Sequence, residues 1–561
     1  MMRDRRRQPQ DRGIVEIGRH ASHLGGKGAG CEPVNPPPAG EVAVRRTDGG
    51  VLAGNEPPSL EYPSTSYAGP PPPPGEDFHP CRFRLPRLSG VTMRTDQSWR
   101  WAVPTVIAVA IALWLGWVGY IASDDGLYYF GAVKWVDNPP YAGVDHWTTR
   151  FPVVLSFAAA IAIFGKGLAA FHAMSLGWFA ALLVTVGLTA KRIGGATAGW
   201  IAVMLTGTMP VLATFASIVN CDMAELVFVL GGIALLPVGR DDMRKGFAAG
   251  ISFGLAFLSR ETAILPLVGL LPIFLCGKPV GRRALIAAGF GFLAVQGAEA
   301  LFQWIVTGDP LHRYGLAINH DDKMDRAANA EGNFLLHPAI DPLLVLLIND
   351  DFALLFWLLI PATIARPWRH LRGRAQSRLL ILGAMAVAAF FVVGALVHEL
   401  VLNPRYFVLA AVTAAIVVAL WLVRLRPMMR AAVLVALVGA NFAALSLANR
   451  HPHWSAEILV ETAQAHSAQA VFTDKTTYDR ALLPLRFAGV RNVQVGAPTA
   501  GSLYVCGPCD DAPGDAITPI APPPTAIGTL FGVIGLDGKL PGGVRRRLMA
   551  PGDAAEVRTI R

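Results

Sequence analysis

The sequence predicts a polytopic α-helical membrane protein with a small α/β domain at its C-terminal end. The chain has 561 residues, of which 53% are hydrophobic and 16% are charged, and its mean hydropathy is +0.42. Soluble globular chains carry about 25% charged residues. The apolar residues also gather between two polar ends, in runs that approach the ~20 residues needed to cross a bilayer. These features exclude a soluble single-domain enzyme, and six cysteines in so long a chain exclude a small disulfide-stabilised secreted domain.

Residues 1–98 are predicted to form a disordered, Pro- and Arg-rich cytoplasmic tail. They contain the runs Pro36–Pro38 and Pro70–Pro74 and no sustained apolar periodicity. Such a segment buries too little apolar surface to offset the entropy lost on folding. No apolar stretch of signal-peptide length precedes Trp101, so the first membrane helix is expected to direct targeting. Met93 is an alternative start of the protein, in which case most of this tail is not translated.

Residues 99–449 are predicted to form the membrane domain. Apolar runs predict helices at 101–119, 171–190, 198–216, 223–239, 284–306, 352–366, 379–397, 406–423 and 431–448. The stretch 246–276 is too long for one crossing, is interrupted at Ser259–Glu261, and has basic residues on both sides. Because Lys and Arg favour the cytoplasmic side, this stretch is predicted to be two short helices. About eleven crossings of the inner (plasma) membrane follow, with the N-terminus inside and the C-terminal domain outside.

The loops predicted on the two sides of the membrane differ in length and charge. The inner loops are short and mostly basic, whereas the outer loops 120–170 and 307–351 are long and rich in acids, aromatics and Pro. The net charge of +9 therefore reports topology and does not indicate nucleic-acid binding. The apolar segment 149–164 is too short to span a bilayer and is predicted to be an interfacial helix. Chemistry is expected on the outer face, with 307–351 as a mobile cover of the site or simply a solvated loop.

Three acidic residues are predicted at the outer surface. Asp124 and Asp125 follow the first helix directly, and Asp222 begins another helix on the same side. Adjacent carboxylates raise each other's pKa when they are partly desolvated, which suits one of them to act as a general base. The alternatives are solvated interfacial acids for the pair and a helix N-cap for Asp222.

Two arginines are predicted on that face as well. Arg150 stands at the head of the interfacial helix, and Arg405-Tyr406 stands at the outer start of the tenth crossing. Each is also typical of a simple interface anchor. Because Arg binds phosphate through two parallel hydrogen bonds, acids and arginines together beside lipid indicate a lipid-linked phosphate substrate.

Several short motifs in this order resemble one superfamily. They are Asp124-Asp125-Gly126-Leu127-Tyr128, Trp147-Thr148-Thr149-Arg150-Phe151-Pro152-Val153, Ile163-Phe164-Gly165, Lys191-Arg192, Met209-Pro210 and Asn220-Cys221-Asp222-Met223. This pattern resembles the protein O-mannosyltransferase and aminoarabinose-transferase superfamily, which includes the RgtA/B/C/D-like bacterial glycosyltransferases. The resemblance covers about residues 101–275, and Arg405-Tyr406 resembles a later Arg-Tyr pair of the family.

The resemblance implies a GT-C fold and transfer of a sugar from a polyprenyl-phosphate donor to a lipid, glycan or protein acceptor on the outer face of the membrane. It implies that Asp124 is the catalytic base, that Asp125 replaces a usual Glu, and that Asp222 is a second acid. Arg150 stands where the family often has Lys and is implied to bind donor phosphate, together with Arg405 and Tyr406. The reaction is expected to invert the anomeric carbon.

Two alternatives stay open at this stage. No cofactor is certain, but a divalent metal ion is an alternative to the arginines, with His398-Glu399 and Asp222 or His320 as candidate ligands. A polytopic transporter or lipid flippase is the alternative function. Transporters are expected to place polar groups near the bilayer midplane, whereas Glu299 and Gln303 lie toward the outer end of their predicted helix and the other informative groups lie at the surface.

Residues 450–561 are predicted to form an extracytoplasmic α/β domain. Short apolar runs at 470–473, 493–495 and 503–505 predict strands, and 476–487 predicts a helix. Cys506 and Cys509 have redox-motif spacing but are followed by acids, Pro and Gly rather than a helix. A structural disulfide is therefore favoured over metal binding or redox exchange.

Overall fold

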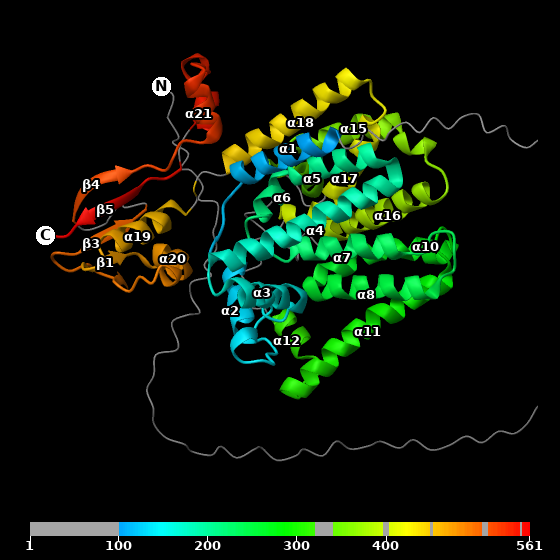
Figure 1. The fold of residues 1–561 in the computed structure, drawn as a ribbon, viewed down its shortest axis with the longest axis horizontal. Helices are drawn as coiled ribbons and strands as arrows, with labels where there is room; N and C mark the ends of the chain where they lie inside the picture. Colours follow the sequence, from blue (N-terminus) through cyan, green and yellow to red (C-terminus); the bar gives the residue numbers. More distant parts are fainter. Residues whose placement is uncertain are drawn as a thin grey trace, which may run out of the picture. The chain divides into compact units, whose positions relative to one another are not determined.

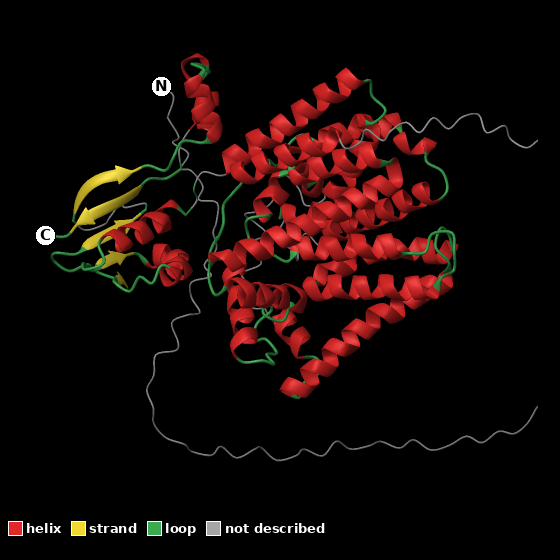
Figure 2. Cartoon of the chain, in the orientation of Figure 1, coloured by secondary structure: helices red, strands yellow, loops and turns green. Residues whose placement is uncertain are grey.

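The computed structural model describes residues 100–319, 340–395, 403–448, 451, 453–507, 514–549 and 552–561. The described part is mainly helical, with one small sheet (Figure 2). The predicted tail 1–98 with Met93, and the candidate residues His320, His398, Glu399 and Cys509, lie outside the described residues.

The membrane part consists of packed helices (Figure 1). They are α1 (Ala102–Leu115), α2 (Asp124–Asp137), α3 (Phe151–Phe164), α4 (Leu168–Gly194), α5 (Ala196–Gly207), α6 (Pro210–Phe215), α7 (Asp222–Leu235), α8 (Met243–Ser259), η3 (Glu261–Ala263), α9 (Ile264–Leu267), η4 (Val268–Leu270), α10 (Leu271–Cys276), α11 (Arg282–Thr307), α12 (His312–Asn319), α14 (Asp341–Ile348), α15 (Leu355–Ala365), η6 (Pro367–His370), α16 (Arg374–Ala395), η7 (Pro404–Phe407), α17 (Val408–Leu422) and α18 (Pro427–Ala448).

The helices follow the predicted apolar runs. Within the described residues, five helices are long and apolar enough to cross a membrane, namely α4, α11, α16, η7 continued by α17, and α18. The predicted interruption of 246–276 is present, because α8 ends at Ser259 and Arg260 adopts an extended conformation. The predicted helix 198–216 is divided into α5 and α6, since Pro210 starts a new helix and cannot continue the old one.

Glycines bring α8 and α11 into backbone contact. A Cβ atom at Gly246 or Gly250 of α8 would overlap the backbone of Ala284 or Ala288 of α11. Small residues allow membrane helices to approach this closely and gain van der Waals contact. The first half of α8 is thereby fixed against α11.

An aromatic cluster holds α2 against α3 and α4. Tyr129 of α2 stacks on Phe171 of α4 with ring centroids 5.1 Å apart, and Phe157 of α3 meets Phe171 edge-on at 4.8 Å. Phe487, from the C-terminal part, contacts Tyr129 at 5.5 Å, and Leu483 is buried in the same cluster. Burial of aromatic rings is a large source of packing energy, so the start of α2 rests on a rigid support.

The C-terminal part is an α/β unit, as predicted, with two strands more than expected. It contains α19 (Trp454–Ala465), β1 (Val471–Thr473), α20 (Lys475–Phe487), β2 (Val493–Val495), β3 (Leu503–Cys506), β4 (Asp515–Ile520), α21 (Ala526–Val533), η8 (Asp537–Lys539), α22 (Gly542–Met549) and β5 (Ala555–Thr559). The strand order is β2-β1-β3-β5-β4. β1 pairs in parallel with β2 and β3, and β5 pairs antiparallel with β3 and β4. In β4 (DAITPI) and β5 (AEVRT) polar residues and Pro separate the apolar residues, so both strands lack the apolar run that predicted the other three.

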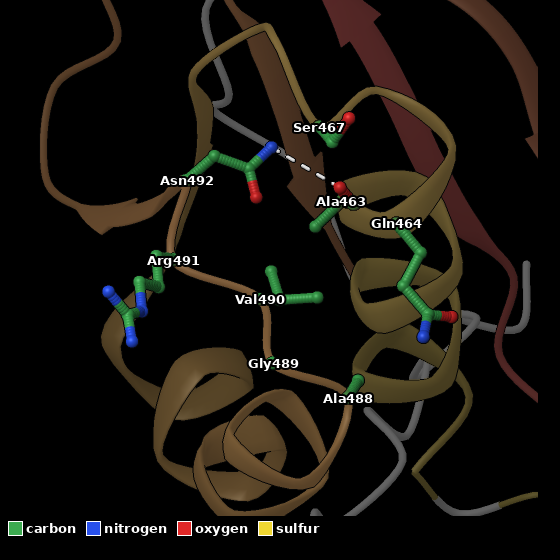
Figure 3. A pocket seen from close by; sticks show the side chains of 8 residues that line it. All are labelled: Ala463, Gln464, Ser467, Ala488, Gly489, Val490, Arg491 and Asn492. Carbon is green, nitrogen blue, oxygen red and sulfur yellow. Dashed lines mark hydrogen bonds between the residues drawn. The ribbon is translucent and has the colours of Figure 1, made fainter.

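A hollow of about 470 Å³ lies between α19 and the loop before β2 (Figure 3). Its lining residues are Ala463, Gln464, Ser467, Ala488, Gly489, Val490, Arg491 and Asn492. The Asn492 amide donates to three backbone oxygens, those of Ala463, His466 and Gln469, at 2.8–3.2 Å. This side chain closes a loop, and no predicted site residue lines the hollow.

Candidate active site

Asp125 is a buried structural group at the start of α2. Its carboxylate accepts hydrogen bonds from the backbone N–H groups of Ile121 (2.7 Å), Ser123 (2.8 Å) and Gly126 (2.9 Å). Burial raises the pKa of Asp125 to about 6, with a small contribution from Asp124, although the three N–H donors act in the opposite direction. Asp125 therefore fixes the loop that leads from α1 into α2.

Asp124 lies beside it and faces a different partner. Its Oδ2 atom accepts from Nη1 of Arg405 at 3.3 Å, and the two side chains are 24% and 36% exposed. The Asn403 side chain accepts from the Arg405 backbone N–H and starts η7. The structure thus brings together an acid and an arginine that are 281 positions apart in the chain.

Arg150 is buried in a hydrogen-bonded network rather than open to solvent. Its Nη1 donates to the Tyr128 hydroxyl at 2.6 Å and to Cys221 Sγ at 3.4 Å, while Nη2 contacts His146 and donates to Glu261 Oε2 at 3.1 Å. Tyr128 follows Asp124 by four residues, so both lie on the same side of α2. Arg150 is therefore tied to the helix that carries Asp124.

Glu261 links Arg150 to a second buried arginine. Its Oε1 accepts from Arg313 Nη2 at 2.7 Å, and Arg313, which is fully buried, also donates to the Phe257 carbonyl at 3.0 Å. One carboxylate between two guanidinium groups offsets part of a positive charge that is costly to leave alone in a buried site. The series Arg313–Glu261–Arg150–Tyr128, named here the buried chain, connects α12 with α2.

Asp222 belongs to a neighbouring charged group. It is 1% exposed and hydrogen-bonded to Nη1 of Arg260, and Glu225 Oε2 lies 3.6 Å from the same nitrogen. The Arg260 guanidinium lies 4.6 Å from the centre of the Tyr406 ring. The Asp222 side chain does not cap α7, so the N-cap alternative is wrong. The Asn220 side chain accepts from the first backbone N–H groups of α7 instead.

The site contains residues that the sequence analysis did not assign to it. They are Tyr128, His146, Cys221, Glu225, Arg260, Glu261 and Arg313. A usable signal was present for Arg260 and Glu261, which interrupt an apolar stretch, and for Glu225, which follows Asp222 by three residues and so shares its helix face. His146 and Cys221 carry no such signal.

Glu299 and Gln303, one turn apart on α11, are both buried. In the described part of the chain neither carboxylate oxygen of Glu299 has a hydrogen-bond partner, whereas the Gln303 amide donates to the Ala142 carbonyl at 3.2 Å. His312 at the start of α12 contacts the Gly143 carbonyl at 3.0 Å. These contacts tie α11 and α12 to the loop that precedes Arg150. The remaining polar residues of the predicted cover, 320–339, lie outside the described residues.

The remaining predicted groups are the candidate metal ligands and the C-terminal cysteines. Among the residues with described positions, no three His, Cys, Asp or Glu side chains are arranged to hold a metal ion. Cys506 is disulfide-bonded, and its pairing with Cys509 stays a prediction.

The fold is similar to that of ArnT, a protein of known structure. ArnT from Cupriavidus metallidurans bound to undecaprenyl phosphate is 12% identical, with a TM-score of 0.52 over 82% of this chain and 98% of ArnT. Apo ArnT is 13% identical, with a TM-score of 0.50 and the same coverage. The Archaeoglobus fulgidus oligosaccharyltransferase AglB, in complex with an inhibitory peptide and a dolichol-phosphate, is 13% identical over 70% of this chain and 64% of AglB, with a TM-score of 0.43. No curated protein sequence matches the chain.

The fold and the family match together describe the class of protein. The chain is a multi-pass membrane protein with the fold of ArnT. Residues 151–305 match the model of the dolichyl-phosphate-mannose-protein mannosyltransferase family, in line with the resemblance of the sequence motifs. The matched segment begins directly after Arg150 and contains Asp222, Arg260 and Glu261.

Proposed function

We propose that this protein transfers a sugar from a polyprenyl-phosphate donor to a lipid, glycan or protein acceptor on the outer face of the inner membrane, with Asp124 as the base and with inversion at the anomeric carbon. The N-terminus is then cytoplasmic and residues 450–561 form a domain outside the membrane. ArnT, which has this fold, binds undecaprenyl phosphate, and this supports the class of donor.

The observation that carries the proposal is the pairing of Asp124 with Arg405. Asp125 and Asp222 are almost fully buried and already hydrogen-bonded, whereas Asp124 is 24% exposed. A general base needs direct contact with the proton it removes. Asp124 is therefore the acid of the three that an incoming acceptor reaches.

The proposed reaction needs a base and cations but no general acid. The acceptor O–H or N–H gives its proton to the Asp124 carboxylate as its oxygen or nitrogen forms a bond to the anomeric carbon. The bond from that carbon to the phosphate oxygen breaks at the same time, and the electron pair leaves with the polyprenyl phosphate. Because this leaving group is a stable anion, arginine stabilises the charge that a glycosidase must neutralise by protonation.

The arginines have different proposed parts in this step. Arg405, which is partly exposed and touches Asp124, is placed to bind the donor phosphate. Arg150 contributes positive charge from the buried side, and its bonds to Tyr128 and Glu261 fix its position. The Arg260 guanidinium lies over the Tyr406 ring. This cation–π contact keeps a further positive charge close to Arg405.

The test is sugar transfer by purified protein in vesicles, with a panel of radiolabelled polyprenyl-phosphate sugars. Asp124→Asn keeps the size of the side chain and removes the base, so transfer is expected to fall by about 10²–10⁴-fold. Asp125→Asn is the matched control, because it removes an adjacent carboxylate that caps the loop. It is expected to lower stability, while the protein that remains folded retains transfer.

Two results would contradict the proposal. Full transfer by folded Asp124→Asn protein would remove Asp124 as the base. Absence of transfer from every donor by folded wild-type protein, together with movement of the labelled lipid across the bilayer, would favour a flippase with this fold.

A further inference from the structure

The helix α21 exposes an apolar face that its own domain does not cover. Leu530, Val533 and Ile534 are 54%, 81% and 53% exposed. Their spacing of three and four residues places them on one side of the helix. Leu536 follows directly and is 38% exposed. Large apolar side chains gathered in one patch mark a surface that interacts with another apolar phase.

This face is joined to the end of a membrane helix. α21 packs against α18, and the Ile527 backbone N–H donates to the Ser446 hydroxyl at 3.0 Å (Figure 1). α18 has 22 residues, a length of about 33 Å at 1.5 Å per residue, which matches the ~30 Å hydrocarbon core. Ser446 is close to the Ala448 end of α18, so α21 lies at the level where the chain leaves the bilayer.

The next helix adds positive charge. α22 packs on α21 and has the sequence Arg545-Arg546-Arg547 at its centre, and the Arg545 side chain is exposed. Lys539, between the two helices, is exposed as well. A helix with an apolar face beside basic residues is the pattern of a segment that lies in the membrane interface and meets anionic headgroups.

We propose that α21 and α22 form a membrane-docking element in which Leu530, Val533 and Ile534 insert among the acyl chains of the bilayer surface at the Ala448 end of α18. Lys539 and Arg545 lie among the lipid headgroups. This element ties the C-terminal part to the membrane independently of the sugar-transfer reaction.

The experiment measures the depth of single side chains with nitroxide labels on cysteines. The full chain carries Cys31→Ser, Cys81→Ser and Cys276→Ser to remove other reactive sites. The same protein without an introduced cysteine is treated with the label to measure background labelling. Val533→Cys reports on α21, and Leu530→Cys is a second variant on the same face. Val435→Cys on α18, at a position 72% exposed, is the control within the bilayer, and Val495→Cys in β2, 46% exposed, is the control in water.

The protein is reconstituted in vesicles of phosphatidylcholine and phosphatidylglycerol, and each label is saturated in the presence of oxygen or of a nickel chelate. Oxygen concentrates in acyl chains and the chelate stays in water. The expected result is that positions 530 and 533 favour oxygen, like 435, while 495 favours the chelate. Preference for the chelate at 530 and 533 would overturn the proposal. So would low access of both reagents, which indicates that a second copy or another protein covers the face.

Discussion

Two of the charged groups in the described residues differ mainly in the exposure of their arginines. The pair Asp124–Arg405, named here the open pair, has side chains that are 24% and 36% exposed. In the buried chain, Arg150 and Arg313 are 8% and 0% exposed, and the Glu261 carboxylate lies between them. The acids of the two groups are similarly exposed, at 24% for Asp124 and 26% for Glu261, but only in the open pair is the arginine exposed as well.

This difference assigns the two groups to different tasks. Near solvent the attraction between ions is weak, so a phosphate or an acceptor replaces one partner at small cost. In a buried site the loss of one partner leaves an uncompensated charge, which is strongly destabilising. The open pair is therefore suited to handle substrate, and the buried chain is suited to hold α2, α12 and the Arg150 loop in one arrangement.

The largest expected effect is on the buried chain. Glu261→Gln removes the charge that balances Arg150 and Arg313, and we expect it to destabilise the protein by about 3 kcal/mol, the lower end of the range for a broken buried pair. The lower end applies because Glu261 is 26% exposed. Denaturant unfolding in detergent measures this. An unchanged unfolding midpoint would mean that the buried chain does not hold the fold.

The next effect concerns the open pair. Arg405→Gln is expected to raise the KM for the lipid-linked donor by about 10–100-fold, since hydrogen bonds to charged groups contribute about 1.5–3 kcal/mol. Arg405→Lys retains the charge and loses the two-point geometry, so its KM should lie between those of Arg405→Gln and the wild type. Stability should be nearly unchanged in both variants. A loss of stability with normal KM would place Arg405 with the structural group instead.

A third effect lies in the C-terminal part, away from both groups. Burial lowers the pKa of His453 to about 4, and Arg480 contributes to the shift. The unfolded chain takes up a proton at His453 below about pH 6.5, but the folded chain does so only near pH 4. Stability from this group is therefore complete above pH 6.5 and falls as the pH drops toward 4, by about 2 kcal/mol at pH 5.

Hydrogen exchange of α19 measures this acid sensitivity, with the wild type compared with His453→Gln at pH 7 and pH 5. At pH 7 the two proteins should be equally protected against exchange. At pH 5 the wild type should lose more protection than the variant, because the variant lacks the titrating group. An equal loss of protection in both proteins at pH 5 would assign the acid sensitivity to another residue.

The smallest expected effect provides a reference for the buried chain. Lys166 and Asp137 form an ion pair at 2.6 Å, with side chains 45% and 42% exposed. Asp137→Asn is expected to cost less than about 1 kcal/mol in the unfolding measurement used for Glu261→Gln, because exposed pairs contribute little. A cost as large as that of Glu261→Gln would show that burial does not separate the two groups.

The sequence by itself determined the membrane class and the positions of the helices, because apolar runs of membrane length and breaks at charged or Pro residues act locally. It indicated the break at Arg260, the helix that follows Arg150, and the helix between β1 and β2. The motifs around Asp124, Arg150 and Asp222 indicated a resemblance to the GT-C superfamily. β4 and β5 were missed, since strands with interrupted apolar residues depend on their partners rather than on their own pattern.

Only the tertiary structure decided which charged residues pair with each other and which of them are buried. Asp124 and Asp125 are neighbours with the same side chain, yet one caps a loop and the other faces Arg405, from a segment far along the chain. Arg150, Glu261 and Arg313 are brought together from three segments that are far apart in the chain. Burial and pairing arise from the packing of distant segments, and a linear pattern does not contain them. For this reason the sequence identified the kinds of residue in the site, and the fold decided their roles.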